Sequence, residues 1–532
     1  MTRRPQVLIP LLLAAFAINL DTTIVNVALP TLVRQLHSSD GQLQWIVDAY
    51  NLVFAAALLS AGSLSDRLGR KGMLLSGLAL FAAASVAGSL AVNSGQLIAA
   101  RCLMGLGAAM VFPATLSLLT NAFTDRAQRA QAIGLWGATA GAAIALGPIF
   151  GGWLLGRFSW ASIFVAMAPV ALLAAALVAR WVPTSRDESA PPLDGVGFAL
   201  STAAMALIVY TIIEAPNHGW SSAPSLGGFA LGLALLSVFV AWERRSAHPM
   251  LDVSLFRNPR FSAASGAVTV SFFTLFGFIF IITQYFQFIR GYSALSAGVH
   301  LLPVAASVAV ASVLGTRVAV RLGTKLVVAA GLVMVAGFYV WVSTSTATTA
   351  YATIAAQMVL YGTGMGLTSA PATESIMGAV PRGKAGVGSA VNDTTRLLGG
   401  TLGVAVLGSV FASVYGAHVA AHLPPALPHH LAALTHTSVG AALALAGHLA
   451  AGGSPLAHPV ATAATNAFIT GESRACLVAG GGAAAGAVAA VALLPAQPPT
   501  AEPQENSAST DTEMRWGASP GETRVTAVSS GR

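Results

Sequence analysis

Long, uninterrupted apolar runs dominate the chain, and short polar or basic segments separate them. The runs do not alternate as barrel strands would, and most approach the roughly 20 residues that a helix needs to cross a bilayer. Helices also satisfy their own backbone hydrogen bonds in lipid. The sequence therefore predicts an all-α polytopic membrane protein with fourteen spans. The spans are expected near 7–29, 43–64, 73–92, 97–119, 131–154, 160–182, 195–214, 225–242, 262–288, 297–316, 325–343, 350–371, 392–415 and 469–494.

Composition agrees with a membrane protein. Charged residues make up 9% and hydrophobic residues 55% of the 532 residues, whereas soluble domains carry about 25% charged residues. So few charges could not cover the surface of a soluble protein of this length. Cys102 and Cys476 fall inside apolar runs and indicate no disulfide framework. Basic residues do not cluster with aromatic ones, so nucleic acid is not expected as a partner.

The placement of basic residues predicts the orientation. With the N-terminus in the cytoplasm, most of the 27 Lys and Arg residues fall in cytoplasmic segments, and only Arg34, Arg157 and Arg290 lie outside. An even number of spans preserves this asymmetry, so both termini are predicted to be cytoplasmic. The first apolar run is interpreted as a retained span and not a secretory signal, because it is too long and contains Asp21.

Two segments are not expected to span the membrane. Residues 417–468 are predicted to form a long external loop, in which the apolar stretch 437–451 is too short to cross. The tail 496–532 is rich in Pro, Ser, Thr and Glu and is predicted to be disordered and cytoplasmic. The loop contains His418, His422, His429, His430, His436, His448 and His458. Metal binding or pH sensing is conceivable for them, but their spacing is not diagnostic of zinc, and no metal site is predicted.

A polar string follows the second span: Gly62-Ser-Leu-Ser-Asp66-Arg67-Leu-Gly69-Arg70-Lys71. The glycines permit a sharp turn, the basic residues hold it in the cytoplasm, and Asp66 is able to accept hydrogen bonds from a helix N-terminus. A merely basic loop would explain the Arg and Lys residues but not the spacing of Gly and Asp. The string resembles the signature loop of the major facilitator superfamily.

Three further strings are similar to the fourteen-span drug–proton antiporter family of that superfamily. They are Leu20-Asp21-Thr-Thr-Ile-Val-Asn26-Val-Ala-Leu-Pro30 in the first span, Arg101-Cys-Leu-Met-Gly105-Leu-Gly107 in the fourth, and Gly141-Ala-Ala-Ile-Ala-Leu-Gly147-Pro148-Ile-Phe-Gly151-Gly152 in the fifth. The last looks like the motif that marks antiporters. The resemblance covers roughly residues 1–495, although Trp160-Ala-Ser-Ile-Phe164 lacks a second Trp and an Arg expected there.

An internal repeat fits the fold that this resemblance implies, two six-helix bundles joined by two extra linking helices. Arg321-Leu-Gly323-Thr-Lys325 echoes the loop after the second span, with Val320 in place of its Asp. The expected units are listed by their boundaries: an N-terminal bundle over 1–185, linking helices over 186–258, a C-terminal bundle over 259–495, and the tail over 496–532.

The resemblance implies a proton-coupled antiporter that exports small hydrophobic, cationic drugs or secondary metabolites across the cytoplasmic membrane. Such a protein would act as a monomer in the lipid bilayer, with a proton gradient in place of a cofactor. A proton-coupled or facilitative nutrient importer is the alternative, and a non-transporting membrane protein is a third. An enzyme is not expected, since the sequence shows no nucleotide-binding loop, metal-ligand cluster or nucleophile–base pair.

Charged residues inside spans are the main functional candidates, because each costs roughly 2.5–3.5 kcal/mol at a helix centre. Asp21, Asp48 and Arg101 fall at one level in the outer half of the membrane. They are predicted to form a protonation and substrate-release cluster that opens outward. Burial favours a protonated carboxyl and a nearby arginine an ionised one, so a proton and a cationic drug would compete for the same group. A static Asp–Arg pair that locks helices together is the alternative.

The fifth span carries closely spaced small residues, Gly137, Gly141 and Ala145, and a second pair, Gly147 and Gly151. Small residues four apart let helices approach closely, and Pro148 removes one backbone hydrogen bond. This helix is predicted to be a tight sliding contact between the two halves that limits proton leak. Ordinary small-residue packing is the alternative.

Other charged residues lie at the ends of spans. Glu374, Asp393 and Arg396 are candidates for a cytoplasmic gate, and Asp393 and Arg396 share a helical face. Interfacial residues that extend toward water are the simpler interpretation. Glu472 and Arg474, at the outer end of the last span, are given the same interfacial interpretation.

Overall fold

A computed structural model describes residues 4–123, 126–186, 194–380 and 385–494, apart from a few side chains within helices. All regular structure in these ranges is helical. The first half of the chain contains α1 Arg4–Ile24, the 3-10 helix η1 Val25–Ala28, α2 Leu29–Leu36, α3 Asp40–Leu68, α4 Arg70–Ser89, α5 Ser94–Ala122, α6 Arg126–Leu155, α7 Ser162–Val165 and α8 Met167–Trp181.

The linking pair is α9 Gly195–His218 and α10 Ala223–Glu243. The second half contains the 3-10 helix η2 Val253–Arg257, α11 Pro259–Gln284, the π-helix η3 Tyr285–Ile289, α12 Ala294–His300, α13 Leu302–Leu322, α14 Thr324–Val342, α15 Tyr351–Ala379, α16 Ala385–His422, α17 His429–Thr437, α18 Val439–Ala451 and α19 Ala457–Leu493.

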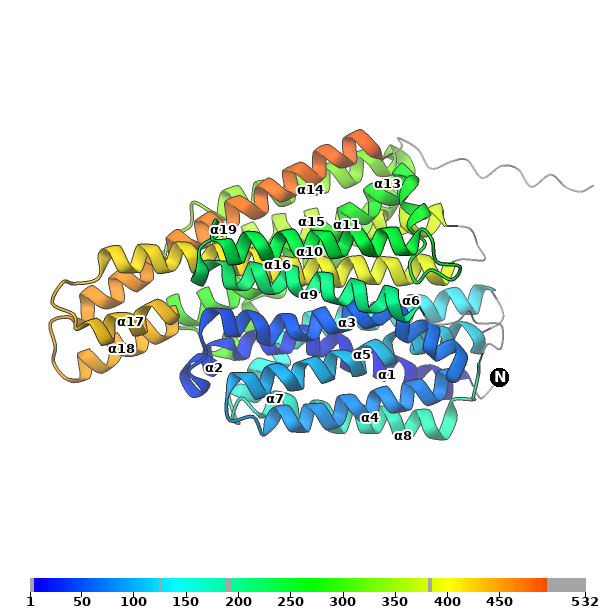
Figure 1. Cartoon of the computed structure of the whole chain (residues 1–532), viewed down its shortest axis with the longest axis horizontal. Coiled ribbons are helices and arrows are strands. Elements are labelled where there is room, and N and C mark those ends of the chain that lie inside the picture. The colour runs from blue at the N-terminus through cyan, green and yellow to red at the C-terminus, as the bar shows by residue number, and fades with distance from the viewer. Residues whose placement is uncertain (1–3, 124–125, 187–193, 381–384, 495–532) are drawn as a thin grey trace, which may run out of the picture.

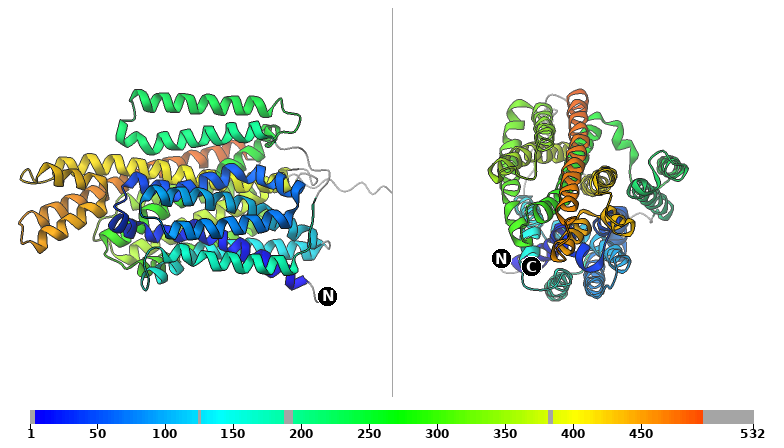
Figure 2. Two further views of the ribbon diagram at one scale, coloured as in Figure 1. Left: turned by 60° about the horizontal axis from the view of Figure 1, so that its bottom comes forward. Right: turned by 90° about the vertical axis from the view of Figure 1, so that its left-hand side faces the viewer.

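The helices form two bundles that lie side by side (Figure 1). α1–α8 make up one bundle, and α11–α16 with α19 make up the other. α9 packs against α3 and α16, one helix from each bundle, and α10 packs against α9. Figure 2 shows α9 and α10 as a separate pair at the side of the molecule. The predicted all-α fold with two bundles and two linking helices is confirmed.

Twelve helices among the described residues are long and apolar enough to cross a membrane. Two more helices of 29 residues each, α3 and α15, lie in the bundles beside them. These elements correspond one by one to the predicted spans. The total of fourteen spans and the cytoplasmic position of both termini stay predictions.

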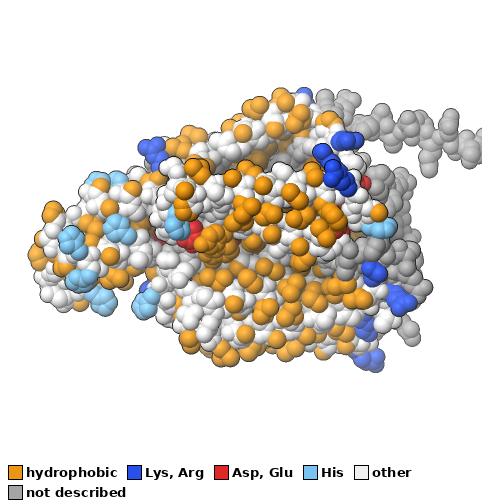
Figure 3. Space-filling view, in the orientation of Figure 1, with side chains coloured by type: hydrophobic (Ala, Val, Ile, Leu, Met, Phe, Trp, Pro, Cys, Tyr) orange, Lys and Arg blue, Asp and Glu red, His pale blue; other side chains and the backbone are white. Residues whose placement is uncertain are grey.

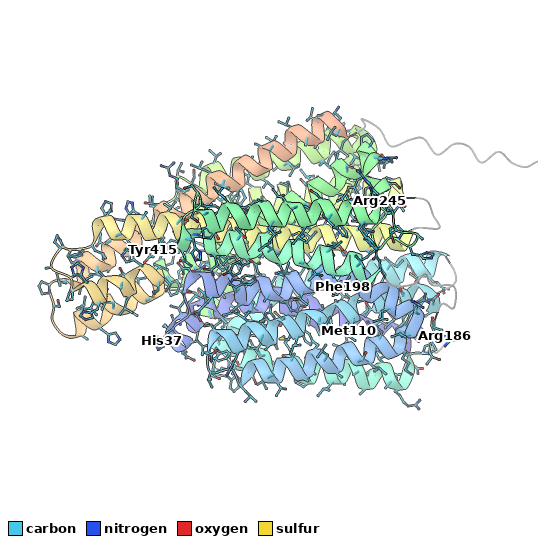
Figure 4. The ribbon with its side chains drawn as sticks, viewed as in Figure 1. His37, Met110, Arg186, Phe198, Arg245 and Tyr415 are labelled. Atoms are coloured by element: carbon cyan, nitrogen blue, oxygen red, sulfur yellow. The ribbon has the colours of Figure 1, made fainter. Side chains whose placement is uncertain are left out.

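Charge separates the two ends of the molecule. Figure 3 shows Lys and Arg gathered mainly at the end where the N-terminus lies, and His at the opposite, protruding end. Figure 4 places Arg186 and Arg245 at the first of these ends and His37 toward the other. In keeping with the predicted orientation, we call the protruding end, which carries α17 and α18, the outer end, and the opposite end the inner end.

The segment predicted as an external loop is largely helical. α16 continues to His422, α17 and α18 follow, and α19 begins at Ala457 (Figure 1). Its alanine-rich composition favours helix, and α18 buries Val439 and Ala442 against neighbouring helices. As expected, α18 is shorter than a membrane span. The tail predicted to be disordered, 496–532, lies outside the described residues.

Candidate functional site

The first helix of the N-terminal bundle breaks one turn after Asp21. α1 gives way to the 3-10 helix η1, and α2 then starts with Pro30 in its first turn, where a missing N–H costs nothing. The side-chain amide of Asn26 donates to the carbonyls of Thr22 (3.5 Å) and Thr23 (3.3 Å) across this break. Asp21 itself is completely buried. The local sequence thus places a carboxyl group next to an irregular backbone segment inside the bundle.

Asp21 of α1 and Arg101 of α5 form a buried ion pair through Oδ2 and Nη1. Arg101 also donates from Nε to the carbonyl of Ile46 in α3 at 2.9 Å. Its guanidinium carbon lies 4.3 Å from the ring centroid of Tyr50, a cation–π contact. The Tyr50 hydroxyl in turn donates to the carbonyl of Ile18 at 3.0 Å. One arginine thereby connects α1, α3 and α5.

Gly105 explains how α5 reaches this position. A Cβ atom on Gly105 would collide with the backbone carbonyl of Tyr50, so only glycine permits this close approach of α5 to α3. Arg101 lies one turn before Gly105 and is therefore brought against the Tyr50 ring. Sequence reasoning missed Tyr50, because an aromatic residue in an apolar span carries no signal that separates it from ordinary packing.

The Asp21–Arg101 pair leaves polar atoms unused. Oδ1 of Asp21 and Nη2 of Arg101 are buried and have no hydrogen-bond partner among the described residues. A buried pair that serves stability needs its remaining lone pairs and protons satisfied, because desolvation otherwise outweighs the attraction. One acceptor on Asp21 and one donor on Arg101 thus have no protein partner in the described structure.

Asp48 is also fully buried but lies on another side of α3. Ile46 and Tyr50 are one turn apart on the face toward Arg101, and Asp48 is about 200° around the helix from Ile46. Gln44, one turn before Asp48, accepts a hydrogen bond from Ser409 of α16 at 3.1 Å. The stripe of α3 that carries Asp48 therefore faces the seam between the two bundles.

The structure thus brings together two of the three predicted cluster residues and not the third. Both carboxylate oxygens of Asp48 are buried without a described hydrogen-bond partner. No described ion pair or hydrogen bond links Asp48 to Asp21 or Arg101. The sequence predicted that the three residues share one level in the membrane. It did not predict that Asp48 lies on a different face of α3 from the one that contacts Arg101. Asp48 is a separate buried carboxyl at the seam.

The bundles are held together toward the outer end. Besides the Gln44–Ser409 contact, Gln287 of η3 donates from Nε2 to the carbonyl of Val27 in η1 at 3.0 Å. Gly440 of α18 packs between Phe288 and Val33, so the outer extension also touches both bundles. The sequence alone did not indicate that Gln287 has a partner in the other bundle. The outer side of the seam is closed in this structure.

The glycines of α6 make two kinds of contact. A Cβ on Gly147 would collide with the Thr23 hydroxyl, and one on Gly151 would lie 2.8 Å from side-chain carbons of Ile24 and Val27. These glycines pack α6 against α1 within the same bundle. A Cβ on Gly141 would have no neighbour within 4 Å. The predicted sliding contact between the halves therefore does not involve Gly141, Gly147 or Gly151 in this state.

The contact between the halves lies at Gly152 and Pro148. A Cβ on Gly152 would be 2.5 Å from the carbonyl oxygen of Ala294 and from Cα of Leu295 in α12. On the other side, a Cβ on Gly298 of α12 would collide with the carbonyl of Pro148. Two glycines, one from each bundle, thus form the close approach on this side of the seam. Gly298 was missed because a single glycine near a span start has no distinctive pattern.

The loop after α3 forms the predicted tight turn. Gly69 has φ +113°, a conformation that favours glycine, and α4 begins at the next residue. Arg70 donates from Nη1 to the hydroxyl of Ser185 at 2.9 Å, and Lys71 donates to the carbonyl of Ala179 at 2.9 Å. A Cβ on Gly62 would lie 3.6 Å from the Pro113 side chain, which is an ordinary contact distance. Arg67 is exposed, and the side chain of Asp66 lies outside the described residues.

The predicted inner gate is only partly assembled. Asp393 and Arg396 of α16 lie 3.9 Å apart, and Arg396 donates to the Thr373 hydroxyl of α15 at 3.1 Å. Glu374 is exposed and has no described contact with this pair. The interfacial interpretation is wrong for Glu472, which is 5% exposed, whereas Arg474 is exposed as expected. The position of Glu472 in the sequence predicts its level in the membrane. It does not predict whether the side chain lies on the buried or the exposed side of α19.

Two of the outer histidines lie against each other. His418 and His422 stack with ring centroids 4.1 Å apart. Within the described ranges, no group of three or more His, Cys, Asp or Glu residues is arranged to hold a metal ion.

Comparisons with known proteins agree with these features. The Major Facilitator Superfamily model matches residues 11–404. The multidrug efflux pump LfrA of Mycolicibacterium smegmatis is 37% identical, over 85% of this chain and 89% of its own length. The multidrug resistance protein Stp of Mycobacterium tuberculosis is 37% identical, over 78% of this chain and 77% of its own length. The methyl viologen resistance protein SmvA of Salmonella typhimurium is 32% identical, over 90% of this chain and 96% of its own length.

Solved structures share the fold. A bacterial homologue of the human lysosomal transporter Spinster, in an inward-facing and unoccupied conformation, has a TM-score of 0.67. Sequence identity is 16%, and the match covers 93% of this chain and 98% of that one. At this identity, the likeness concerns the arrangement of helices alone.

Proposed function

Because the chain belongs to the major facilitator superfamily, we propose that it is a proton-coupled antiporter that exports small hydrophobic, cationic drugs. It is a multi-pass protein of the cytoplasmic membrane, with many apolar helices and bacterial relatives of that class. Relatives named for multidrug efflux and for methyl viologen resistance support this substrate class. Methyl viologen is an aromatic dication, which a buried carboxylate would attract.

The observation that carries the proposal is the Asp21–Arg101 pair with its unused atoms. Deep inside a bundle, an ionised Asp21 is compensated by one guanidinium, and Oδ1 remains open to a further partner. A proton or a cationic substrate would neutralise this carboxylate, and each would exclude the other. Competition for one group couples the two flows, because a ligand shifts an equilibrium only through its differential affinity. Arg101 acts as a positioning residue that holds the carboxylate between α1, α3 and α5.

The outer side of the seam is closed in this structure, so the proposed transport cycle also needs a state in which it opens. In this state the close approaches at Gly152 and Gly298 and the Gln44–Ser409 contact seal the outer side. Substrate would enter from the inner side and leave outward once these contacts separate. Asp48 lies on the seam face of α3, so the same separation would expose its carboxyl to the outer solution. We therefore assign Asp48 to proton entry and Asp21 to the exchange itself.

Ethidium transport by inside-out membrane vesicles tests the proposed function. Energised vesicles that contain the protein should accumulate this fluorescent cation, because an exporter points into their lumen. Vesicles from cells without the protein serve as the control, and a protonophore should abolish the difference. Gradient-driven loss of ethidium from the lumen would indicate an importer. Accumulation that persists after the proton gradient collapses would reject proton antiport.

A further inference from the structure

A second buried carboxyl lies in the C-terminal bundle, away from the Asp21–Arg101 pair. Glu472 is in α19 and only 5% exposed. The next residue, Ser473, donates to the carbonyl of Ser343 at 2.8 Å, which fixes this part of α19 to the outer end of α14. Glu472 therefore lies inside the bundle near its outer end and does not extend to the surface.

The Glu472 side chain lines a small, partly open cavity of about 10 Å³. Its walls are mainly aromatic and aliphatic side chains from α11, η3, α14 and α15, with a few polar ones, one of them just after α14. They include Phe278, Tyr285, Phe338, Ser345 and Gln357. A cavity of this size holds about one water molecule. A proton, with or without a water, fits beside the carboxyl, whereas a drug-sized cation does not.

Within the described part of the chain, no basic side chain compensates Glu472. Among the described residues, none forms an ion pair or a hydrogen bond with its carboxyl group. Arg290, on the same side of the bundle, is engaged by the carbonyls of Ala347 (3.1 Å) and Thr349 (3.0 Å). Arg474 points outward and is exposed. An ionised carboxylate here would be unpaired in a low-dielectric interior, which is very costly.

The groups around the cavity suit a neutral carboxyl. Gln357 is 2% exposed and donates from Nε2 to the Ser345 hydroxyl at 3.1 Å. The Tyr285 hydroxyl donates to the carbonyl of Thr346 at 3.0 Å. The titratable groups that interact with Glu472 are Tyr285 and, one turn along α19, Cys476, and Arg290 in turn lies against Tyr285. A protonated Glu472 offers both a donor and an acceptor to the few polar groups of this largely apolar pocket.

Buried hydroxyl groups continue from the cavity toward the inner end. Tyr361 packs on Phe278 of the cavity wall, with ring centroids 5.1 Å apart. Its hydroxyl donates to that of Thr274 at 3.3 Å. Ser271 and Ser265 follow along α11 toward the inner end, and both are buried. Ser265 Oγ has no described hydrogen-bond partner. These side chains place buried polar groups at successive levels of the bundle between the cavity and the inner end.

We propose that Glu472 is a second proton-binding site, which carries an additional proton in each transport cycle. The proposal rests on the proposed antiport function. It assigns one proton to Asp21 in the N-terminal bundle and one to Glu472 in the C-terminal bundle. Outward movement of one monovalent cation would then accompany inward movement of two protons. The exchange moves one net positive charge inward and responds to the membrane potential.

Glu472→Gln in reconstituted vesicles tests this assignment. In the wild-type protein, ethidium export should respond to a pH gradient and also to a potential negative on the cytoplasmic side. One net charge per cycle changes the steady-state ethidium gradient about tenfold for each ~59 mV. Glutamine keeps the shape of a neutral glutamic acid but cannot release a proton. The variant should keep export driven by the pH gradient and lose the response to the potential.

Glu243→Gln is the matched control. Glu243, the last residue of α10, is also buried, but its Oε2 accepts a hydrogen bond from the backbone N–H of Leu251 at 2.9 Å. This variant should keep both responses. A Glu472→Gln protein that keeps the full response to the potential contradicts the proposal. So does one that is present at wild-type amounts but no longer responds to the pH gradient, because the two sites would then not be separate.

The proton count of the wild-type protein gives a test that needs no variant. The potential that just balances a fixed ethidium and pH gradient yields the number of protons per cation. A ratio of two supports the second site, and a ratio of one overturns it while leaving the exporter intact. Export with no response to the pH gradient would instead contradict the proposed antiport function.

Discussion

Replacing Asp21 by asparagine is expected to abolish ethidium export driven by the proton gradient, down to the level of vesicles without the protein. Asparagine keeps the size of aspartic acid but neither ionises nor binds a proton, so the exchange between proton and cation is lost. The buried Arg101 then also lacks its counter-charge, which costs about 3–5 kcal/mol in buried ion pairs. Initial export rates, divided by the amount of protein in the membrane, measure the effect.

Asp40→Asn separates a coupling defect from a general effect of losing a buried carboxyl. Asp40 lies in the first turn of α3, is 7% exposed and has no basic partner among the described residues. We expect this variant to export at nearly the wild-type rate. If Asp21→Asn protein is present at normal amounts and also exports normally, Asp21 is not the coupling group, and the pair is a static link between helices.

Replacing Gly152 by alanine is expected to slow export about 5- to 150-fold. The added methyl group would meet the backbone of Ala294 and Leu295 at 2.5 Å, and overpacking of this kind costs about 1–3 kcal/mol. The cost applies only while the two bundles touch at the outer end, so it shifts the conformational equilibrium by the corresponding factor. The protein would remain in states with the outer side open. The measured quantity is the export rate per molecule of transporter.

Gly137→Ala supplies the control on the same helix. A Cβ at Gly137 would have no neighbour within 4 Å, and alanine favours helix over glycine by about 1 kcal/mol at either position. Any general effect of alanine on α6 would therefore appear in both variants. Equal export rates for Gly152→Ala and Gly137→Ala would show that the contact with α12 does not limit the transport cycle.

The architecture was predictable because bilayer length and charge bias act on the sequence directly. Apolar runs near 20 residues must be spans, and the repeat of the loop after the second span indicates two related bundles. The helical outer extension was less predictable. Its apolar stretches are too short to cross, so the sequence excluded a span but did not indicate how α17 and α18 pack.

The site was predictable in composition and depth but not in orientation around each helix. Asp21, Asp48 and Arg101 share a level, yet only a three-dimensional structure shows Arg101 against Tyr50 and Asp48 on the seam face of α3. Glu472 shows the same limit. Its position at the end of a span predicts an interfacial residue. Whether its side chain lies at the surface or in the interior depends on which neighbours cover that side of α19.

Proton release on substrate binding tests the central claim most directly. Purified protein in a weakly buffered solution with a pH indicator is mixed with ethidium, and the protons released are counted per ethidium bound. If a cation and a proton compete for Asp21, the wild-type protein should release protons as ethidium binds, and Asp48→Asn protein should still do so. Binding of ethidium to the wild-type protein without any proton release would contradict the exchange at Asp21.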